Sequence, residues 1–312
     1  MMMYQHLYGP VPSRRLGRSL GIDLVPHKVC SYDCIYCQIG KTTEKTLLRK
    51  EYIPAQEVLG ELEAFLSKNG SSIEHISLSG SGEPTLHSEI RLVIEGIKKM
   101  TLIPIAVLTN GSLLYEEEVR RDLIGADIVL PSLDAASSEI FLRINRPHEG
   151  VSVEKVIEGI VEFRKGYQGQ IWLEILFCKG VNDSQSELLQ LKKTVDRIQP
   201  DLVHLNTVVR PPSEPSAVPL GLKEMEEIRA FFGERASIIS EFDRHHLGVP
   251  EKDRREEILR ILRRRPLSLT DLSEGMGIPQ KELEGYIRFM VEEGMIKIRS
   301  FGNATYYEIS KT

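Results

Sequence analysis

Three of the four cysteines in this 312-residue chain lie within eight residues of one another. Cys30, Cys34 and Cys37 have the spacing C-x3-C-x2-C, and the fourth cysteine, Cys178, lies far along the chain. Thiolates are soft ligands that suit zinc, copper(I) and iron–sulfur clusters. A structural zinc site takes four ligands, and no neighbouring His or Cys completes this set. Three thiolates on a [4Fe–4S] cube leave one iron open for another ligand, which indicates a reaction centre.

Polar residues and glycines follow several of the short apolar runs in this sequence. Because the carboxyl ends of parallel strands meet at one edge of a sheet or barrel, we expect these residues to lie close together. Each residue alone also fits a structural role, as a turn, a helix cap or a paired carboxylate. The candidate residues are Ser81, Gly82, Glu83, Pro84, Asn110, Ser132, Asp134 and Glu174.

The elements that position these residues alternate between strand and helix patterns. The strand-like runs are short and rich in Ile, Val and Leu, as expected for parallel strands that are buried on both faces. Repeated βα units with right-handed crossovers build a parallel sheet or barrel. Six such units predict an α/β fold with an open, partial (β/α)6 barrel over residues 1–245. The predicted strands are 19–25, 75–79, 104–109, 127–132, 170–177 and 202–209, and the predicted helices are 55–68, 87–100, 116–123, 153–164 and 184–198.

The pattern changes at Arg254. An amphipathic helix over 254–265 precedes a helix–turn–helix with Pro279 near the second start and Gly294 at its end. A two-stranded hairpin with Gly302-Asn303 in its turn closes the chain. We expect a small winged helix-turn-helix domain over residues 254–312, which a linker over 246–253 joins to the barrel.

The cysteine motif resembles a known signature. C-x3-C-x-aromatic-C, with Tyr36 as the aromatic residue, is similar to the motif of the radical S-adenosylmethionine (SAM) superfamily, and it follows a first strand as it does there. The resemblance implies that Cys30, Cys34 and Cys37 hold a [4Fe–4S] cluster and that its open iron chelates the amino and carboxylate groups of SAM. An electron from a donor such as ferredoxin or flavodoxin would then cleave SAM to methionine and a 5′-deoxyadenosyl radical, which abstracts hydrogen from a substrate.

The same resemblance assigns roles to the residues at the strand ends. Ser81–Pro84 resembles the Gly-Gly-Glu-Pro element that holds the methionyl amino group, with serine in place of its first glycine. Ser132 and Asp134 resemble residues that bind the ribose hydroxyls or the methionine carboxylate. Glu174 matches a further ribose contact. The resemblance also implies that Asn110 faces this cleft and that Tyr36 packs near the adenine.

Four segments resemble the branch related to the wyosine-forming tRNA enzymes, over roughly residues 8–245. They are "YGPVPSRRLGRSLGIDLVP", "SGSGEPTLH", "INRPHEG" and "VVRPPSEP". The chain departs from those enzymes at Gln38, where they usually have Trp, and in having no cysteine before Cys30 for a second cluster. The branch implies RNA, with tRNA first, as the substrate; a protein or a small metabolite is the alternative.

Arginines flank the first, fourth and sixth predicted strands, where they could reach the mouth of the barrel. Guanidinium groups there suit a carboxylate or phosphate of SAM or of the substrate, although surface ion pairs are the alternative role. These candidate substrate ligands are Arg14, Arg15, Arg18, Arg143, Arg146 and Arg210.

The charge of the chain limits the role of the winged helix. The net charge is −5, and the second helix of the helix–turn–helix carries more acidic than basic residues, which disfavours groove reading. Arg263–Arg265 and Lys297–Arg299 remain candidate phosphate contacts. We expect the domain to recruit RNA or protein, or to cover the barrel; an iron–sulfur DNA-binding redox regulator is the contrasting hypothesis.

No apolar run approaches the ~20 residues of a membrane span, so we expect a cytoplasmic enzyme without a membrane partner.

Overall fold

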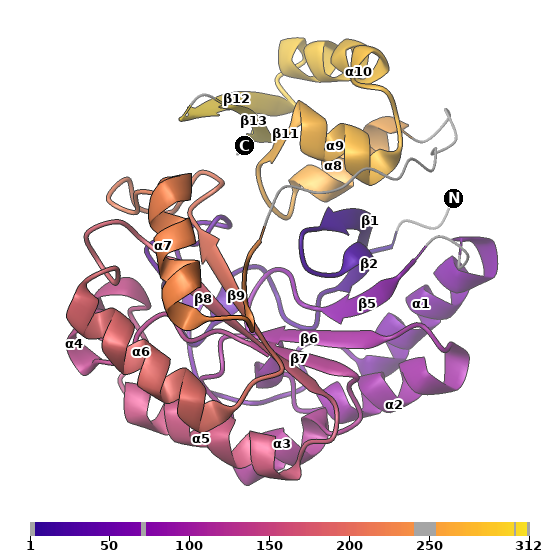
Figure 1. Ribbon diagram of the computed structural model, residues 1–312. Helices are drawn as coiled ribbons and strands as arrows, with labels where there is room; N and C mark the ends of the chain where they lie inside the picture. Colours follow the sequence, from indigo (N-terminus) through magenta and orange to yellow (C-terminus); the bar gives the residue numbers. More distant parts are fainter. Residues whose placement is uncertain (1–3, 70–72, 240–253, 303, 311–312) are drawn as a thin grey trace.

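The computed structural model describes residues 4–69, 73–239, 254–302 and 304–310. One large sheet with helices on its outer face holds most of the chain before residue 240, and residues 254–310, called here the C-terminal unit, lie above one edge of that sheet (Figure 1). The predicted linker, 246–253, and Asn303 of the predicted turn lie outside the described residues.

The large sheet has eight strands in the order β1-β2-β5-β6-β7-β8-β9-β10, and all neighbours run parallel except β1 and β2. The six predicted strands are confirmed as β2 and β5 to β9. Two strands that were not predicted, β1 and β10, extend the sheet at its two edges. The bounds are β1 (Leu7–Ser13), β2 (Gly17–Ile22), β5 (His75–Leu78), β6 (Ile105–Thr109), β7 (Ile128–Pro131), β8 (Gln170–Phe177), β9 (Leu202–Thr207) and β10 (Ala236–Ile238).

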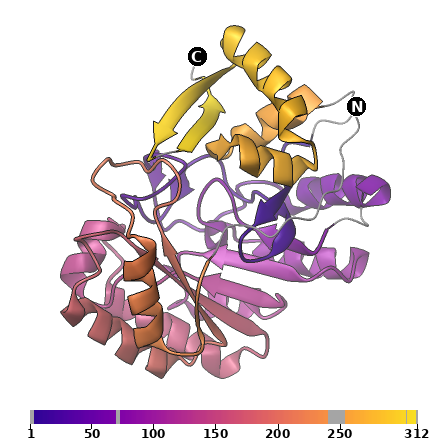
Figure 2. The same ribbon diagram turned by 45° about the horizontal axis from the view of Figure 1, so that its top comes forward.

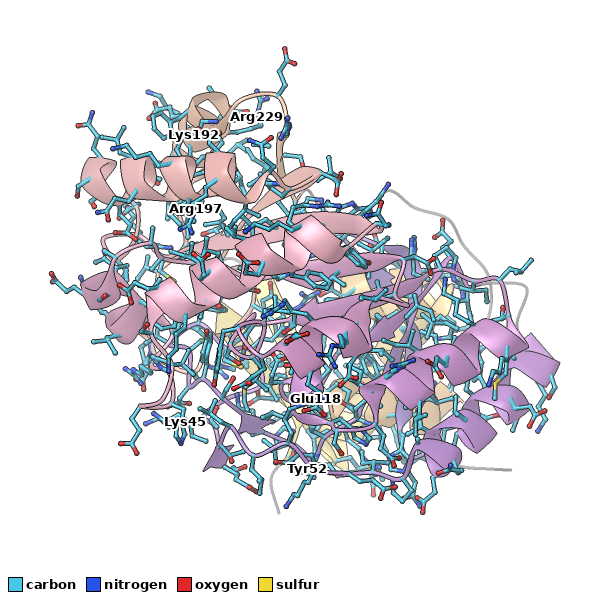
Figure 3. All side chains as sticks on the ribbon, turned by 90° about the horizontal axis from the view of Figure 1, so that it is seen from below. Lys45, Tyr52, Glu118, Lys192, Arg197 and Arg229 are labelled. Carbon is cyan, nitrogen blue, oxygen red and sulfur yellow. The ribbon has the colours of Figure 1, made fainter. Side chains whose placement is uncertain are left out.

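Amphipathic helices cover the outer face of this sheet. In α2, Ile90, Val93, Ile94 and Ile97 recur at helical spacing and are all buried. Figure 3, seen from below, shows the side chains of this helical face, among them Glu118 of α3 and Arg197 of α6. The five predicted helices are confirmed, and α4 and α7 were not predicted. The bounds are α1 (Ala55–Asn69), α2 (Ile90–Met100), α3 (Glu117–Leu123), α4 (Ser138–Ile144), α5 (Val153–Gly166), α6 (Gln185–Ile198) and α7 (Leu222–Phe232).

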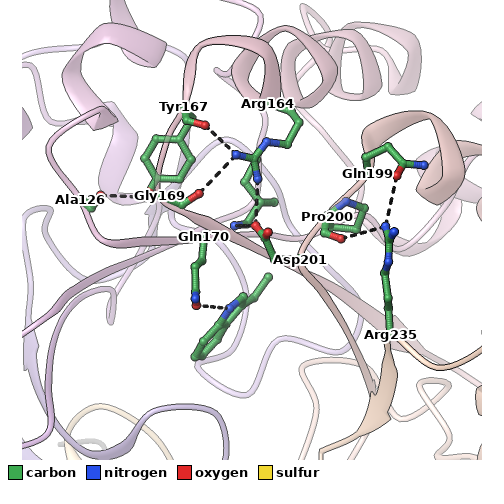
Figure 4. A network of polar contacts seen from close by, with 11 residues as sticks. Ala126, Arg164, Tyr167, Gly169, Gln170, Gln199, Pro200, Asp201 and Arg235 are labelled. Atoms are coloured by element: carbon green, nitrogen blue, oxygen red, sulfur yellow. Dashed lines mark hydrogen bonds and ion pairs between the residues drawn. The ribbon is translucent and has the colours of Figure 1, made fainter.

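A polar network fixes the amino ends of β8 and β9 (Figure 4). Arg164 of α5 donates to the Asp201 carboxylate at 2.8 Å and to the Tyr167 carbonyl at 2.6 Å, and Asp201 accepts from the Ile171 amide at 2.7 Å. The Tyr167 hydroxyl donates to the Ala126 carbonyl at 2.8 Å. These contacts satisfy backbone N–H and C=O groups at the amino ends of the strands, so this end of the sheet has a structural role. The candidate functional residues lie at the opposite, carboxyl ends of the strands.

The C-terminal unit contains three helices and a three-stranded sheet in the order β11-β13-β12. Its elements run helix, strand, helix, helix, strand, strand, which is the order of a winged helix. The three predicted helices and the predicted hairpin are present, β11 was not predicted, and the first helix ends three residues earlier than expected. The bounds are α8 (Arg254–Leu262), β11 (Leu267–Ser268), α9 (Leu269–Met276), α10 (Gln280–Glu292), β12 (Ile296–Phe301) and β13 (Ala304–Ile309).

The C-terminal unit packs on β1 (Figure 2). Val11 of β1 is buried in the apolar core that Ile258 and Leu283 help to form. At Gly275 of α9 an added Cβ would lie 2.6 Å from the Pro12 ring, so the two backbones approach too closely for a side chain. The β1 strand therefore belongs to both parts of the molecule. Within the described ranges, none of the helices combines the length and apolarity that crossing a membrane requires.

Candidate functional site

The first clustered cysteine, Cys30, ends β3 (Val29–Cys30), and Cys34 and Cys37 follow it on the loop that leads to β4 (Glu44–Lys45), which pairs with β3 in parallel. The Cys37 amide donates to the Cys34 carbonyl at 3.1 Å, which closes a tight turn. From outside the loop, the Ile35 amide donates to the Ile144 carbonyl at 3.0 Å and the Ser213 hydroxyl to the Cys34 carbonyl at 3.0 Å. The end of α4 and the segment after β9 thus hold the cysteine loop in place.

Each cysteine sulfur faces an N–H donor from a different part of the chain. Such donors stabilise negative charge on sulfur, as the thiolate ligands of an iron–sulfur cluster require. The contacts are Asn110 Nδ2 to Cys30 Sγ at 3.6 Å, Asn145 Nδ2 to Cys34 Sγ at 3.5 Å and Lys28 Nζ to Cys37 Sγ at 3.1 Å.

The thiols of Cys30 and Cys34 are protonated at neutral pH. Burial, with the Glu83 carboxylate adding to it, raises the pKa of Cys30 to about 12, and burial also raises the pKa of Cys34. Coordination to iron deprotonates a thiol outright, so the surrounding donors gain their full effect when metal is bound. No three His, Cys, Asp or Glu side chains of the described segments are placed to hold a single metal ion. In a [4Fe–4S] cluster each thiolate binds a different iron, and the three cysteines with their N–H donors fit that requirement.

The loop after β5 passes directly under the cysteine loop. At Gly82 an added Cβ would lie 1.9 Å from the Val29 carbonyl oxygen, and the Glu83 amide donates to that oxygen at 3.1 Å. Gly80 has φ +120°, where an added Cβ would lie 2.2 Å from the Asp23 carboxylate. Only glycine fits at these two positions. Pro84 then begins a short 3₁₀ helix, η2 (Pro84–Leu86).

Glu83 joins the loops after β5 and β6. Its buried carboxylate accepts from the Thr85 amide at 3.1 Å, the Thr85 hydroxyl at 2.6 Å, the Thr109 hydroxyl at 2.6 Å and the Asn110 amide at 2.7 Å. Burial raises the pKa of Glu83, while these hydrogen bonds favour its ionised form. Because two of the four donors come from the loop after β5 and two from the end of β6 and the loop after it, the carboxylate orders these strand ends, including Asn110, which lies beside Cys30.

Asp134 plays a similar role after β7. Its carboxylate accepts hydrogen bonds from the Tyr36 hydroxyl, from Asn145 Nδ2 at 2.7 Å and from the Leu176 amide at 2.9 Å. Burial raises the pKa of Asp134 to about 6. The side chain therefore fixes Tyr36, one residue before Cys37, in a defined orientation.

Ser132, the residue after β7, lies beside Glu174 of β8. An isolated bridge joins their backbones, and the Ser132 side chain is only half-buried. The Glu174 carboxylate pairs with Arg15 and accepts from Asn206 Nδ2 at 3.0 Å. Burial raises the pKa of Glu174, but the charge and hydrogen bond of Arg15, together with the Asn206 hydrogen bond, hold that pKa below its ordinary value. Glu174 is therefore ionised at neutral pH.

A cleft of about 210 Å³ opens inside the curve of the sheet beside the cysteine loop. Tyr36, Cys37 and Glu174 line one part of it. The β1–β2 turn reaches this cleft because Leu16, which is buried, packs against Ile128 and Leu130 inside the barrel. The arginines that line the cleft are Arg14, Arg15, Arg210 and, from the C-terminal unit, Arg265.

The other three candidate arginines, Arg18, Arg143 and Arg146, do not line this cleft. Arg18 lies at the amino end of β2, where its amide donates to Glu74 at 2.6 Å. Arg143 is exposed on α4 and donates to the Gly180 carbonyl at 3.3 Å. Arg146 pairs with Glu214 at 2.9 Å beside the cysteine loop. The position of these arginines near predicted strands did not indicate which groups their side chains would contact.

Two residues of the candidate site, Lys28 and Asn145, were not indicated by the sequence. Lys28 is buried and Asn145 ends α4, and both approach a cysteine sulfur only because separate loops meet there. Arg265 was expected as a nucleic-acid contact, yet it faces the barrel.

Comparisons with known proteins show the family to which the chain belongs. The family model described as "Radical SAM superfamily" matches residues 24–191. The UPF0026 protein MJ1312 of Methanocaldococcus jannaschii is 32% identical over 98% of this chain and 96% of its own length. A protein of Brachyspira hyodysenteriae described as GTPase Obg is 36% identical over 98% of this chain, which spans 45% of that relative's length.

Among solved structures, the crystal structure of a radical SAM methyltransferase from Sphaerobacter thermophilus matches in fold. Its TM-score is 0.53 at 17% identity, over 70% of this chain and 65% of that one. This chain therefore belongs to the radical SAM superfamily, and it is a radical SAM enzyme whose cofactors are a [4Fe–4S] cluster and S-adenosylmethionine.

Proposed function

We propose that Cys30, Cys34 and Cys37 hold the cluster and that the enzyme abstracts a hydrogen atom from a substrate bound in the cleft beside Tyr36. The observation that supports this proposal is the set of three sulfurs on one anchored loop, each facing an N–H donor, with Cys37 opening on the cleft. When bound, the reduced cluster supplies the electron that cleaves SAM to methionine and a 5′-deoxyadenosyl radical.

Residues of the neighbouring loops would position SAM. In this proposal the backbone of Ser81–Pro84 approaches the methionyl amino group, because Gly82 leaves no side chain between that loop and the cysteine loop. The half-buried side chains of Asn110 and Ser132 face the ligand. Tyr36 packs near the adenine in the orientation that Asp134 gives it. Glu174, ionised and paired with Arg15, would accept from the ribose hydroxyls.

For the substrate we propose RNA, with tRNA first, on the resemblance of four segments to the wyosine-related branch. The exposed residues of α10 do not favour nucleic acid, because four of the six charged ones are acidic. We therefore propose that the chain divides into a barrel, 1–245, and a winged helix, 254–312. The winged helix would contribute to substrate binding through the side that faces the barrel. The charged residues of α10 and its end are Lys281, Glu282, Glu284, Arg288, Glu292 and Glu293.

Radical SAM enzymes need an electron donor, and we propose a ferredoxin or flavodoxin for this role. A reducing cytoplasmic compartment would keep the cysteine thiols available for iron.

The experiment that tests the proposal is anaerobic reconstitution of the full chain with iron and sulfide, followed by dithionite and SAM. We expect 5′-deoxyadenosine, measured by liquid chromatography and mass spectrometry. Cys34→Ala should lose both bound iron and product, because three thiolates are the minimum set here. Cys178→Ala is the matched control: this fourth cysteine is buried in the barrel core, so the variant should keep both. A wild-type protein that is fully loaded with iron and forms no 5′-deoxyadenosine would contradict the proposal.

A further inference from the structure

We infer that the cleft binds a phosphate group of the substrate between Arg14, Arg210 and Arg265, so that the substrate is a phosphorylated molecule; this inference rests on the proposed function. The three arginines come from distant parts of the chain. Arg14 lies in the β1–β2 turn, Arg210 follows β9, and Arg265 follows α8 in the C-terminal unit. The site therefore exists only when the C-terminal unit is docked on the barrel.

The charges that line the cleft are not balanced within the protein. Arg15 is neutralised by Glu174, and Arg210 pairs with Asp271 of α9 at 3.2 Å. In the segments that the structure describes, no carboxylate lies within ion-pair distance of Arg14 or Arg265. Four guanidinium groups thus line the cleft, and the carboxylates that act on them are Glu174 and Asp271, which leaves two positive charges in excess. In addition, the buried Nε of Arg210 has no hydrogen-bond partner.

Holding these cations together is unfavourable without an anion. Burial, and then the neighbouring Arg210 and Arg15, lower the pKa of Arg14 to about 10, although the carboxylates Glu174 and Asp271 partly offset this shift. Burial and Arg210 lower the pKa of Arg265 to about 9. Both groups stay protonated at neutral pH, where they repel their neighbours in a partly desolvated site. A bound anion would remove this repulsion.

The two unbalanced charges fit a phosphate better than a carboxylate. A phosphate monoester carries about −1.5 to −2 charges at pH 7 and has three acceptor oxygens, whereas a carboxylate carries one charge and two oxygens. Guanidinium groups present planar, paired donors that match phosphate geometry. The single carboxylate of SAM would leave one arginine unpaired.

The same cleft is lined by Tyr36 and Cys37, beside the proposed cluster. A phosphate held by the three arginines would anchor the substrate at a distance from the reacting carbon. Such an anchor orients the reacting group without taking part in the chemistry. The C-terminal unit thereby becomes part of the substrate site through Arg265.

Isothermal titration of the reconstituted full chain with pyrophosphate, at constant ionic strength and with saturating SAM, tests this inference. We expect wild-type binding, and about tenfold or greater weakening in Arg14→Gln and in Arg265→Gln, since each removes charged hydrogen bonds. Arg263→Gln is the matched control, because Arg263 is exposed in the same segment and does not line the cleft. Arg265→Lys keeps the charge and should retain part of the affinity, which separates loss of charge from misfolding.

Parallel titrations with 5′-AMP and glycerol 3-phosphate distinguish a nucleotide substrate from a small phosphorylated metabolite, and tighter binding of either than of pyrophosphate supports the inference. The inference would be overturned if pyrophosphate did not bind, if all variants bound it equally, or if SAM displaced it completely. Formation of 5′-deoxyadenosine is scored separately. If the wild-type protein forms 5′-deoxyadenosine but binds no pyrophosphate, the inference fails and the proposed function stands. If it binds pyrophosphate but forms no 5′-deoxyadenosine, the proposed function fails and the anion site stands.

Discussion

Lys28 brings a buried positive charge into the cysteine loop. The residue adopts φ 62°, which is uncommon for a side chain with a Cβ, and its amide donates to the Ser81 carbonyl at 2.7 Å. This backbone conformation aims Nζ at Cys37 Sγ, 3.1 Å away. A cation at that position would stabilise the reduced form of the proposed cluster relative to the oxidised form, because the reduced form is more negative.

We therefore predict that Lys28→Met lowers the midpoint potential of the cluster, because the reduced form carries one more negative charge. The expected shift is on the order of 60 mV, which corresponds to a tenfold change for a one-electron couple. A redox titration followed by electron paramagnetic resonance measures it. Lys41→Met is the control, since Lys41 is 72% exposed and pairs with Glu214. Equal shifts in the two variants would exclude a specific role for Lys28.

At this scale the sequence indicated the candidate ligands of the cofactors more readily than the side chains that surround them. The cysteines and the Ser81–Pro84 loop have types and spacings that point to one chemistry. Lys28 and Asn145 have no such pattern, because their function comes from loops that meet only in the fold. Asp134 was expected to contact the ligand, whereas its carboxylate accepts three hydrogen bonds within the protein.

At the scale of elements, the segment between α8 and β11 supports the loop after β5. Arg264 forms an ion pair with Asp23 and donates to the Ser81 hydroxyl at 2.8 Å. The Asp23 side chain is 3% exposed and accepts from the Ser81 amide at 2.6 Å. Burial raises the pKa of Asp23, and Arg264 lowers it. The C-terminal unit thus stabilises a loop that we propose contacts SAM.

Arg264→Gln should destabilise the protein by about 3 kcal/mol, because it leaves a buried carboxylate without its counter-ion. We also expect weaker SAM binding, since Ser81 loses a partner. Urea denaturation and equilibrium dialysis measure the two effects, with the exposed Arg263→Gln as control. Combining Arg264→Gln with Asp23→Asn should recover part of the lost stability. Strictly additive losses would show that the two residues do not interact.

The regular βα units were predictable because buried parallel strands are continuous Ile, Val and Leu runs. The β1 strand was missed because Gly9, Pro10 and Pro12 interrupt its pattern, and prolines of this kind are tolerated at a sheet edge. The β10 strand has only three residues. The α7 helix, in contrast, buries Met225, Ile228 and Phe232 at helical spacing and was within reach of the same reasoning.

At the scale of the whole molecule, β1 connects two apolar cores. Leu7 packs in the barrel core, whereas Val11 packs in the core of the C-terminal unit. The register between β1 and β2 shifts between Tyr8 and Val11, as in a β-bulge, which turns the second half of the strand toward the C-terminal unit. Arg260 adds hydrogen bonds to the carbonyls of Leu7 at 3.3 Å and of Gly9 at 2.5 Å.

Because one strand serves both cores, we predict that the barrel and the C-terminal unit unfold in a single transition. Trp172, the only tryptophan, lies in β8 and reports on the barrel, whereas circular dichroism reports on all helices. The two urea curves should coincide for the wild type. Val11→Asp places an unpaired charge between the parts and should separate the curves, while Leu102→Asp, at a side chain that is 99% exposed, should leave them coincident. Separate transitions in the wild type would mean that the C-terminal unit is only loosely held, and the arginine cleft would then form only in the docked state.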